Sequence, residues 1–183
     1  MTGTSTFTLA RYVDFKQGGE IQRKWQRRFG RSCVIGTPDI IAGGAGDPTA
    51  IASAIKQKIS LVDSFRSRTV ETLSKADEPK IRELFWEFQK ATGRTNRNGL
   101  NASPVGAAKA MHLLCPYFLP LWDGDIADLY RCDHDAFGYA KFCQLMKGFA
   151  ATVQAYLANP DDRSILKRID EYNWAITRRR QVS

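Results

Sequence analysis

"SPVGAAKAMHLLCPYFLPLWDGDIADLY", residues 103–130, joins a Pro-Val-Gly turn, a short helical pattern and a proline-interrupted apolar run that ends on an acid. Ser103 is placed to cap a helix that begins at Pro104, because serine caps helices well and proline is favoured in their first turn. A turn that leads into a helix in this way presents backbone N–H groups at a positive helix end, which suits a phosphate group. The acid is Asp123, and the residues alone leave it two roles. It is either the N-cap of a following helix, where Asp125 competes, or a functional carboxylate held by rigid apolar neighbours.

The surrounding sequence predicts a helix, a polar turn and a second helix over about residues 80–115. In the first helix, apolar residues recur at i, i+3, i+4 and i+7 and form one stripe: Ile81, Leu84, Phe85 and Phe88. Trp86 lies off this stripe, so we expect its side chain to be partly exposed. The polar turn covers residues 92–104. Further upstream, apolar periodicity from Pro48 predicts one long helix or two stacked helices that end near Ser74.

Length and composition favour a single helical domain, with residues 1–46 as a possible small N-terminal lobe. The chain has 183 residues and carries 27 lysines and arginines against 19 aspartates and glutamates, a formal net charge of +8. This excess favours a polyanionic partner. The longest apolar run, MHLLCPYFLPLW, is too short to span a bilayer, and the N-terminal residues lack the pattern of an export signal. The sequence therefore predicts a cytoplasmic protein with no membrane partner.

The cysteines of this chain, Cys33, Cys115, Cys132 and Cys143, are expected to be free buried thiols rather than disulfides. They include no C-x-x-C pair, the spacing that is typical of zinc sites. A zinc site could be assembled from Cys132, His134 and the remaining cysteines, but this spacing disfavours it. We therefore predict no metal ion.

Two segments of the chain are strongly basic. RKWQRRFGR, residues 23–31, belongs to a predicted amphipathic helix whose polar side includes Arg27 and Arg28. RRR, residues 178–180, lies close to the end of the sequence. Such segments are either solvated helix faces or contacts to a nucleic-acid backbone, and a helical hairpin in the same chain favours the second interpretation.

Three consecutive motifs, SPVGAAKAMHLL, FLPLWD and GDIADLY, resemble the signature of the helix-hairpin-helix DNA glycosylase superfamily. That signature is a hairpin of the type PGVG, a helix, an apolar run and a catalytic aspartate that opens another helix. The resemblance covers about residues 80–132. It departs from the family pattern at Ser103, which replaces the leading glycine, and in a shorter stretch from Gly106 to Asp123. It implies an all-α, helix-hairpin-helix DNA glycosylase-like fold with its hairpin motif at about residues 80–115 and its catalytic segment at about residues 118–131.

The activity that this resemblance implies is that of a monofunctional DNA glycosylase, which hydrolyses the N-glycosidic bond of a flipped modified or damaged base and leaves an abasic site. Asp123 would stabilise the positive charge that develops on the deoxyribose or orient the attacking water. Ala108 falls where strand-cutting members of the family carry a nucleophilic lysine. Lys109 comes one residue later, which is about 100° of helix rotation. A shift of register by one residue would make Lys109 a Schiff-base nucleophile.

Candidates for the walls of a base pocket are Trp122, Trp86, Tyr12 and Phe15, each with ordinary core packing or simple exposure as its alternative. The expected DNA contacts lie in the hairpin turn, at the start of the second helix and in the first basic segment: Ser103, Val105, Gly106, Lys109, Arg94, Arg97, Asn98, Arg27 and Arg28. His112 is expected to be a satisfied, semi-buried histidine rather than a proton shuttle.

The expected partner is therefore DNA, as a duplex with an extruded base, and the expected reaction needs no cofactor. A monomer in a prokaryotic cytoplasm is the default. The excised base stays open between bulky modified cytosines of phage DNA and the alkylated, oxidised or deaminated bases of ordinary repair. The rival interpretation is a non-catalytic helix-hairpin-helix DNA-binding module in which Asp123 only caps a helix. A helical regulator that binds an acidic protein would account for the charge but leave the hairpin unexplained.

Overall fold

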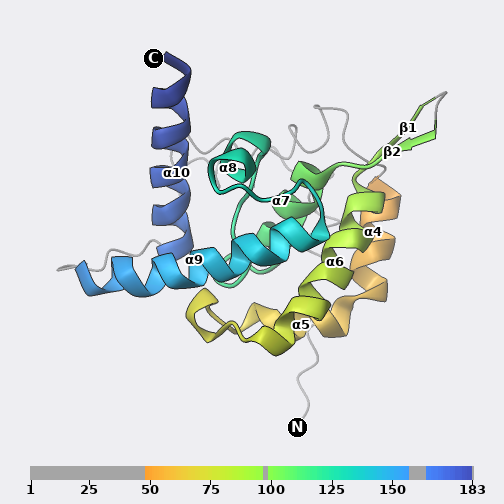
Figure 1. Cartoon of the computed structure of the whole chain (residues 1–183). Helices are drawn as coiled ribbons and strands as arrows, with labels where there is room; N and C mark the ends of the chain where they lie inside the picture. The colour runs from red at the N-terminus through yellow and green to blue at the C-terminus, as the bar shows by residue number, and fades with distance from the viewer. Residues whose placement is uncertain (1–47, 97–98, 157–163, 183) are drawn as a thin grey trace, which may run out of the picture. The chain divides into compact units, whose positions relative to one another are not determined.

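The computed structural model describes residues 48–96, 99–156 and 164–182, all within the second of two compact units, Gly46–Ser183. The first unit, Met1–Ala45, has nearly the extent of the small lobe considered from the sequence, and it lies outside the described residues. Figure 1 shows the described part as α-helices with one short ribbon of two strands. The predicted all-α class is confirmed, because each strand of the ribbon has only three residues.

From Pro48 the sequence predicted either one long helix or two stacked helices. The structure has two short helices, followed by two 3-10 turns. They are α4 (Pro48–Gln57), α5 (Ile59–Arg66), η2 (Val70–Thr72) and η3 (Lys75–Asp77). The α-helical part therefore ends at Arg66, and the predicted end near Ser74 is wrong. Val70 and Leu73 are nevertheless fully buried, as their apolar spacing predicted.

The carboxylate of Asp77 explains why the chain turns in this region instead of continuing as a helix. It accepts two hydrogen bonds from the guanidinium of Arg68, at 2.9 and 2.8 Å, and two from the backbone N–H and hydroxyl of Ser74, at 2.8 and 2.7 Å. The Arg68 guanidinium also lies 4.4 Å from the centre of the Phe118 ring. The hydrogen bonds from Arg68 hold the pKa of the Asp77 carboxyl far below its usual range. This pair fixes the 3-10 turns against the core.

The helical hairpin consists of α6 (Glu78–Ala91), β1 (Arg94–Asn96), β2 (Gly99–Asn101) and α7 (Pro104–Leu114). The two helices confirm the predicted helix–turn–helix and its boundaries. The connection differs from the predicted polar turn, because it forms an antiparallel ribbon in which Thr95 pairs with Leu100. The dipeptide Asn98-Gly99 is a hairpin signal that the sequence already contained.

The second half of this unit contains α8 (Gly124–Leu129), α9 (Ala136–Tyr156) and α10 (Ile165–Val182). In Figure 1, α9 crosses α6, and α10 stands across α9 beside α8. The Tyr130 hydroxyl donates to the side-chain oxygen of Asn173 at 2.6 Å and so ties the end of α8 to α10. The buried residues of these two long helices include Phe142, Met146 and Ile169, whereas Tyr172 is exposed.

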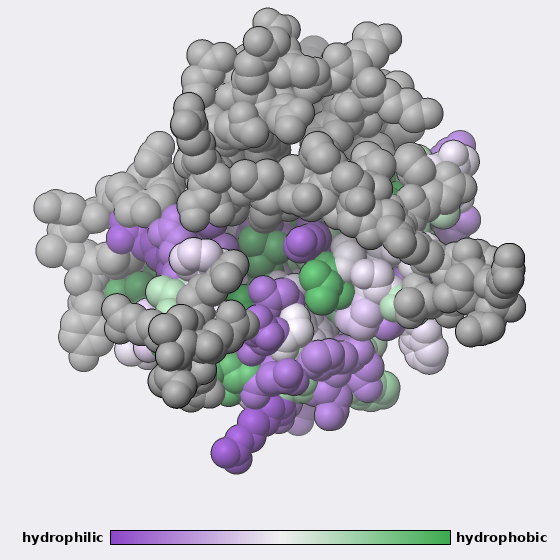
Figure 2. Space-filling model, turned by 90° about the horizontal axis from the view of Figure 1, so that it is seen from above, coloured by the Kyte–Doolittle hydropathy of each residue, from purple (hydrophilic) through white to green (hydrophobic). Residues whose placement is uncertain are grey.

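The core lies where α6, α7 and α9 meet, and it includes all four residues of the predicted stripe on α6. Trp86 is 59% exposed, which confirms its predicted position off that stripe. Figure 2 shows the described surface seen from above as mainly hydrophilic areas with smaller hydrophobic ones between them.

We expect Asp77→Asn to lower the free energy of unfolding at pH 7 by about 1–3 kcal/mol, because it removes a charged acceptor of four hydrogen bonds. The pKa of Asp77 is lower in the folded state, so its contribution is complete above the unfolded pKa and is lost as the pH falls below about 4. Urea unfolding at pH 7 and at pH 3 measures this, and the deficit of the variant should shrink at pH 3.

The matched control is Asp63→Asn, which removes an exposed carboxylate that pairs with Arg66 one turn away on α5. Exposed pairs of this kind contribute little, so we expect a change below about 0.5 kcal/mol. Equal losses in the two variants at pH 7 would contradict the role given to Asp77.

Candidate functional site

The candidate site begins where the end of α6 touches the start of α7. The Thr92 hydroxyl donates to the Phe88 carbonyl at 2.7 Å, and the backbone N–H of Ser103 donates to the Gln89 carbonyl at 3.4 Å. A Cβ atom on Gly106 would lie 2.8 Å from the hydroxyl oxygens of both Thr92 and Ser103, closer than real Cβ contacts allow. The glycine of the PVG turn therefore permits the close approach of the two helices.

The first turn of α7 is capped as the sequence predicted. The Ser103 hydroxyl accepts the Gly106 N–H at 3.0 Å, and the Ser103 carbonyl accepts the Ala107 N–H at 2.9 Å. Pro104 has no N–H group. Among the described residues, nothing accepts the N–H of half-buried Val105. This helix end therefore offers a phosphate one backbone donor in its first turn, fewer than a turn of free amides would.

Ala108 and Lys109 face different surroundings on α7. Ala108 is fully buried, whereas Lys109 is half-buried and makes no ion pair with the residues that the structure describes. Lys109 follows Val105 by four residues, so the two share one face of the helix. With respect to the described residues, a free N–H group and an unpaired ammonium group therefore lie along one side of α7.

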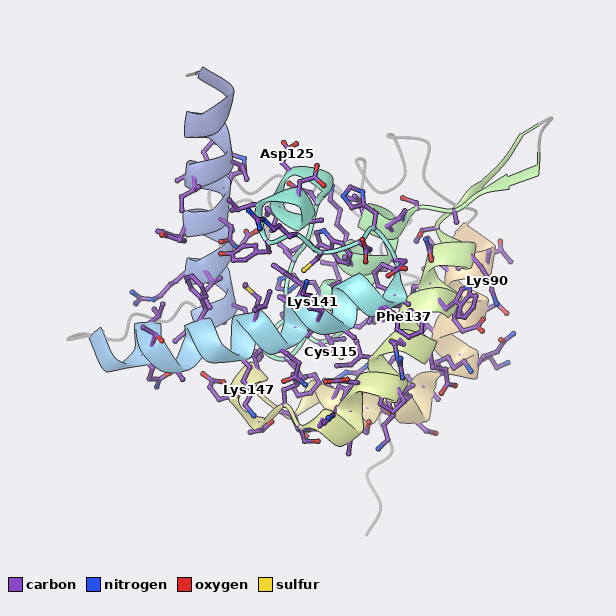
Figure 3. All side chains as sticks on the ribbon, in the orientation of Figure 1. Lys90, Cys115, Asp125, Phe137, Lys141 and Lys147 are labelled. Carbon is purple, nitrogen blue, oxygen red and sulfur yellow. The ribbon has the colours of Figure 1, made fainter. Side chains whose placement is uncertain are left out.

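Asp123 is the N-cap of α8. One of its carboxylate oxygens, Oδ1, accepts the Ile126 N–H at 2.9 Å, and the side chain is half-buried. The other oxygen, Oδ2, makes no hydrogen bond to any described residue. The competing acid, Asp125, lies one residue inside the helix and is exposed, and Figure 3 shows it on the outer side of α8. The capping role considered from the sequence is confirmed, and it occupies only half of the carboxylate.

The residue before Asp123 is anchored in an aromatic stack. The Trp122 ring is stacked on Tyr139 with 5.2 Å between ring centres, and Phe85 lies 5.8 Å from Trp122 and 4.8 Å from Tyr139. The Tyr139 hydroxyl donates to the Pro120 carbonyl at 2.8 Å. Trp122 is only 3% exposed, so it packs in the core, which was the alternative to a place in a base-pocket wall. It supports the segment that leads to Asp123 and does not line an open pocket.

The other predicted site residues are spread over the chain. Trp86 lies on α6 with the Lys90 ammonium 5.8 Å from its ring centre. Arg94 opens β1, which places it at the base of the ribbon near Ser103 in the sequence. The remaining candidates lie outside the described residues: Tyr12, Phe15, Arg27, Arg28, Arg97 and Asn98.

His112 of α7 is a satisfied buried histidine, as the sequence indicated. Its ring Nδ1 lies 2.7 Å from the Leu119 carbonyl, which fixes Nδ1 as the donor. Burial lowers the pKa of this imidazole, so the ring is neutral near pH 7. His112 therefore holds the apolar run against α7.

The thiols of Cys115, Cys132 and Cys143 are free and buried, as predicted, and Cys33 lies outside the described residues. Burial raises the pKa of Cys115 to about 12, so this thiol is protonated at neutral pH. Within the described ranges, no group of three or more histidines, cysteines or acids is arranged to hold a metal ion.

A histidine that the sequence treated only as a possible metal ligand lies against the residues on either side of Asp123 in the chain. His134, in the loop between α8 and α9, pairs with Asp128 of α8, with 3.0 Å between Nε2 and Oδ1. The edge of its ring faces Trp122, with 6.3 Å between ring centres. Periodicity could not have placed His134 here, because the contact depends on how the loop folds back onto α8.

No model of a known protein family matches the chain, and no match was found among curated proteins or among solved structures. Among the helices of the described residues, none has the length and apolar character needed to cross a membrane.

We expect Gly106→Ala to lower the free energy of unfolding by about 1–3 kcal/mol, because the new methyl group meets Thr92 and Ser103 at 2.8 Å. Gly148→Ala is the matched control. Nothing lies within 4 Å of a Cβ atom at this exposed position in α9, so the same change should stabilise the helix by about 0.5–1 kcal/mol. Thermal and urea unfolding measure both values, and effects of the same sign would contradict the close packing at Gly106.

Proposed function

We propose that this protein is a monofunctional DNA glycosylase of the helix-hairpin-helix type, with Asp123 as its catalytic carboxylate. One observation carries the proposal: Asp123 is half-buried and fixed through one oxygen, while the other oxygen has no hydrogen bond to any described residue. A carboxylate used only as a cap needs one oxygen. The second is available to a reacting group.

The chemistry of base excision suits this arrangement. Breaking the bond between C1′ and the base nitrogen leaves positive charge on the deoxyribose ring. A carboxylate that is already oriented stabilises this charge without reorganising, and it can accept a proton from the water that attacks C1′. The N–H of Ile126 orients Oδ1, and the aromatic stack behind Trp122 keeps the segment in place. Oδ2 is thus the oxygen that would face the sugar.

The α6–α7 hairpin is the part that would hold the DNA backbone. The free N–H of Val105 and the ammonium of Lys109 lie on one face of α7, and Arg94 opens the ribbon between the two helices. Backbone contacts of this kind position DNA without reading its sequence. Ser103 and Gly106 would act indirectly, since they shape the helix start. The basic residues Arg27, Arg28 and Arg97 remain candidates for further phosphate contacts.

The same geometry favours hydrolysis over strand cutting. Ala108 occupies the position of the family's nucleophilic lysine and is fully buried, and Lys109 faces other surroundings. Lyase chemistry would require the ammonium of Lys109 to reach C1′.

For the substrate we propose a bulky modified cytosine. The sequence is similar in size and pattern to the bacteriophage replication inhibition DNA glycosylase, a small prokaryotic defence protein, and that likeness implies excision of such bases from phage DNA. A prokaryotic cytoplasm and action as a monomer on duplex DNA belong to the same proposal. Repair of alkylated, oxidised or deaminated bases is the alternative substrate class.

A second candidate function is a non-catalytic DNA-binding module. The observation in its favour is the N-cap itself, because the hydrogen bond from Ile126 gives Asp123 a structural role that needs no substrate. Asparagine caps helices about as well as aspartate. An Asp123→Asn variant therefore keeps the cap, loses the charge and separates the two functions.

We expect Asp123→Asn to lower the excision rate on the order of 10²-fold or more, because it removes the charge that stabilises the sugar cation. Purified protein is incubated with duplexes that carry modified cytosines or damaged bases, and alkali then breaks the DNA at abasic sites. Asp125→Asn, an exposed neighbour on α8, is the control and should retain activity. Breakage before alkali would reassign the reaction to Lys109. Salt-dependent DNA binding without excision of any base would favour the binding module.

Lys109→Ala should weaken DNA binding and reduce the slope of log affinity against log salt by about 1, because one phosphate contact is lost. Lys75→Ala is the charge-matched control. Lys75 lies in η3, before the start of α6, whereas α7 begins beside the other end of that helix, about 20 Å away. Fluorescence anisotropy with a labelled duplex at several salt concentrations measures both variants. Equal slopes for Lys109→Ala and the wild type would remove Lys109 from the interface.

A further inference from the structure

His134 touches the residues on both sides of Asp123. Its Cε1 atom lies 3.6 Å from the position of a Cβ atom on Gly124, and its ring meets the Trp122 ring edge-on. Because Trp122 and Gly124 flank Asp123 in the chain, the imidazole lies against the segment that carries the proposed catalytic carboxylate. This neighbour belongs to the loop between α8 and α9, which is a separate part of the chain from the segment that carries Asp123.

The imidazole is oriented through one nitrogen and open at the other. Nε2 lies 3.0 Å from the Asp128 carboxylate, and Nδ1 makes no hydrogen bond to the residues that the structure describes. His134 is 48% exposed, which leaves room for a ligand to approach its ring. A carboxylate that accepts from one ring nitrogen leaves the other nitrogen to exchange a proton with a substrate.

We propose that His134 is a second catalytic residue, which protonates the departing base through Nδ1 while Asp128 accepts from Nε2. This inference rests on the proposed glycosylase function. The bond between C1′ and the base nitrogen breaks, and its electron pair stays with the base. The Nδ1 proton then passes to the base. It bonds either to the nitrogen that was attached to C1′ or to another ring atom onto which the electron pair has delocalised. Water then bonds to C1′ and gives a proton to Asp123, so that both side chains exchange one proton per cycle.

A proton donor of this kind decides which bases the enzyme removes. A neutral base leaves as an anion unless a proton arrives as the bond breaks, so its excision depends on His134. A base that already carries a positive charge, such as 7-methylguanine, leaves as a neutral molecule and needs no donor. The pair of His134 and Asp128 therefore fits substrates with neutral bases, which include the modified cytosines proposed above.

The test is single-turnover excision by the wild type and His134→Gln across pH 5 to 9, with two duplexes that differ only in the target base. One duplex carries the neutral base found in the substrate panel, and the other carries 7-methylguanine. We expect His134→Gln to slow excision of the neutral base on the order of 10²- to 10⁴-fold and that of 7-methylguanine by less than about threefold. Asp128, the charged group paired with the ring, is unchanged in this comparison.

The pH profile provides the second readout. A proton donor must be protonated to act, so the wild-type rate on the neutral base should fall as the pH rises. This decline should be absent in His134→Gln. A purely structural histidine would not move the profile.

The outcomes separate the inference from the function on which it rests. Two results with an active wild type would overturn the role of His134 and leave the glycosylase in place. One is that His134→Gln loses the same activity on both bases, and the other is that its pH profile matches that of the wild type. Absence of excision of every base by the wild type would overturn both. Urea unfolding of each variant shows whether the fold is retained. If His134→Gln unfolds, His134→Asn takes its place, and full activity on 7-methylguanine is itself evidence of a folded enzyme.

Discussion

The close contact between Gly106 and Thr92 is the constraint on which the rest of this structure depends. It brings the start of α7 against the end of α6, and two hydrogen bonds link the helices, from the Ser103 N–H to the Gln89 carbonyl and from the Thr92 hydroxyl to the Ser103 carbonyl. Since α6 also packs on α9 through Phe85 and Tyr139, the position of α7 fixes where the apolar run after it meets the core. A side chain at residue 106 would disturb this whole sequence of contacts.

The candidate site combines a rigid support with a partly open carboxylate. Trp122, Tyr139 and Phe85 stack within one core, and the hydrogen bond from Tyr139 to the Pro120 carbonyl fixes the backbone that leads to Asp123. One oxygen of Asp123 completes the helix start and the other has no partner among the described residues. Stability and catalysis therefore make compatible demands on this residue, since the cap orients the carboxylate that the reaction would use.

Charge is distributed unevenly along the sequence. The chain has a net charge of +8, yet residues 123–135 include five aspartates and a single arginine. A surface that bound DNA everywhere would not concentrate acids in this way, because they repel phosphates. In the proposed enzyme the basic residues of the hairpin would hold the DNA backbone. The acidic loop would meet only the extruded nucleotide, whose sugar becomes positive as the bond breaks.

The sequence by itself determined the helical class, the hairpin of α6 and α7, the cap at Ser103, the buried stripe on α6 and the exposure of Trp86. These features depend on contacts between residues a few positions apart, which periodicity and capping rules describe. Only the tertiary structure decided that Trp122 is a buried support, that Asp77 binds Arg68 and Ser74 in the turns after α5, and that His134 packs against Trp122 and Gly124. Each of these depends on chain segments that meet through folding, and no local pattern specifies such meetings.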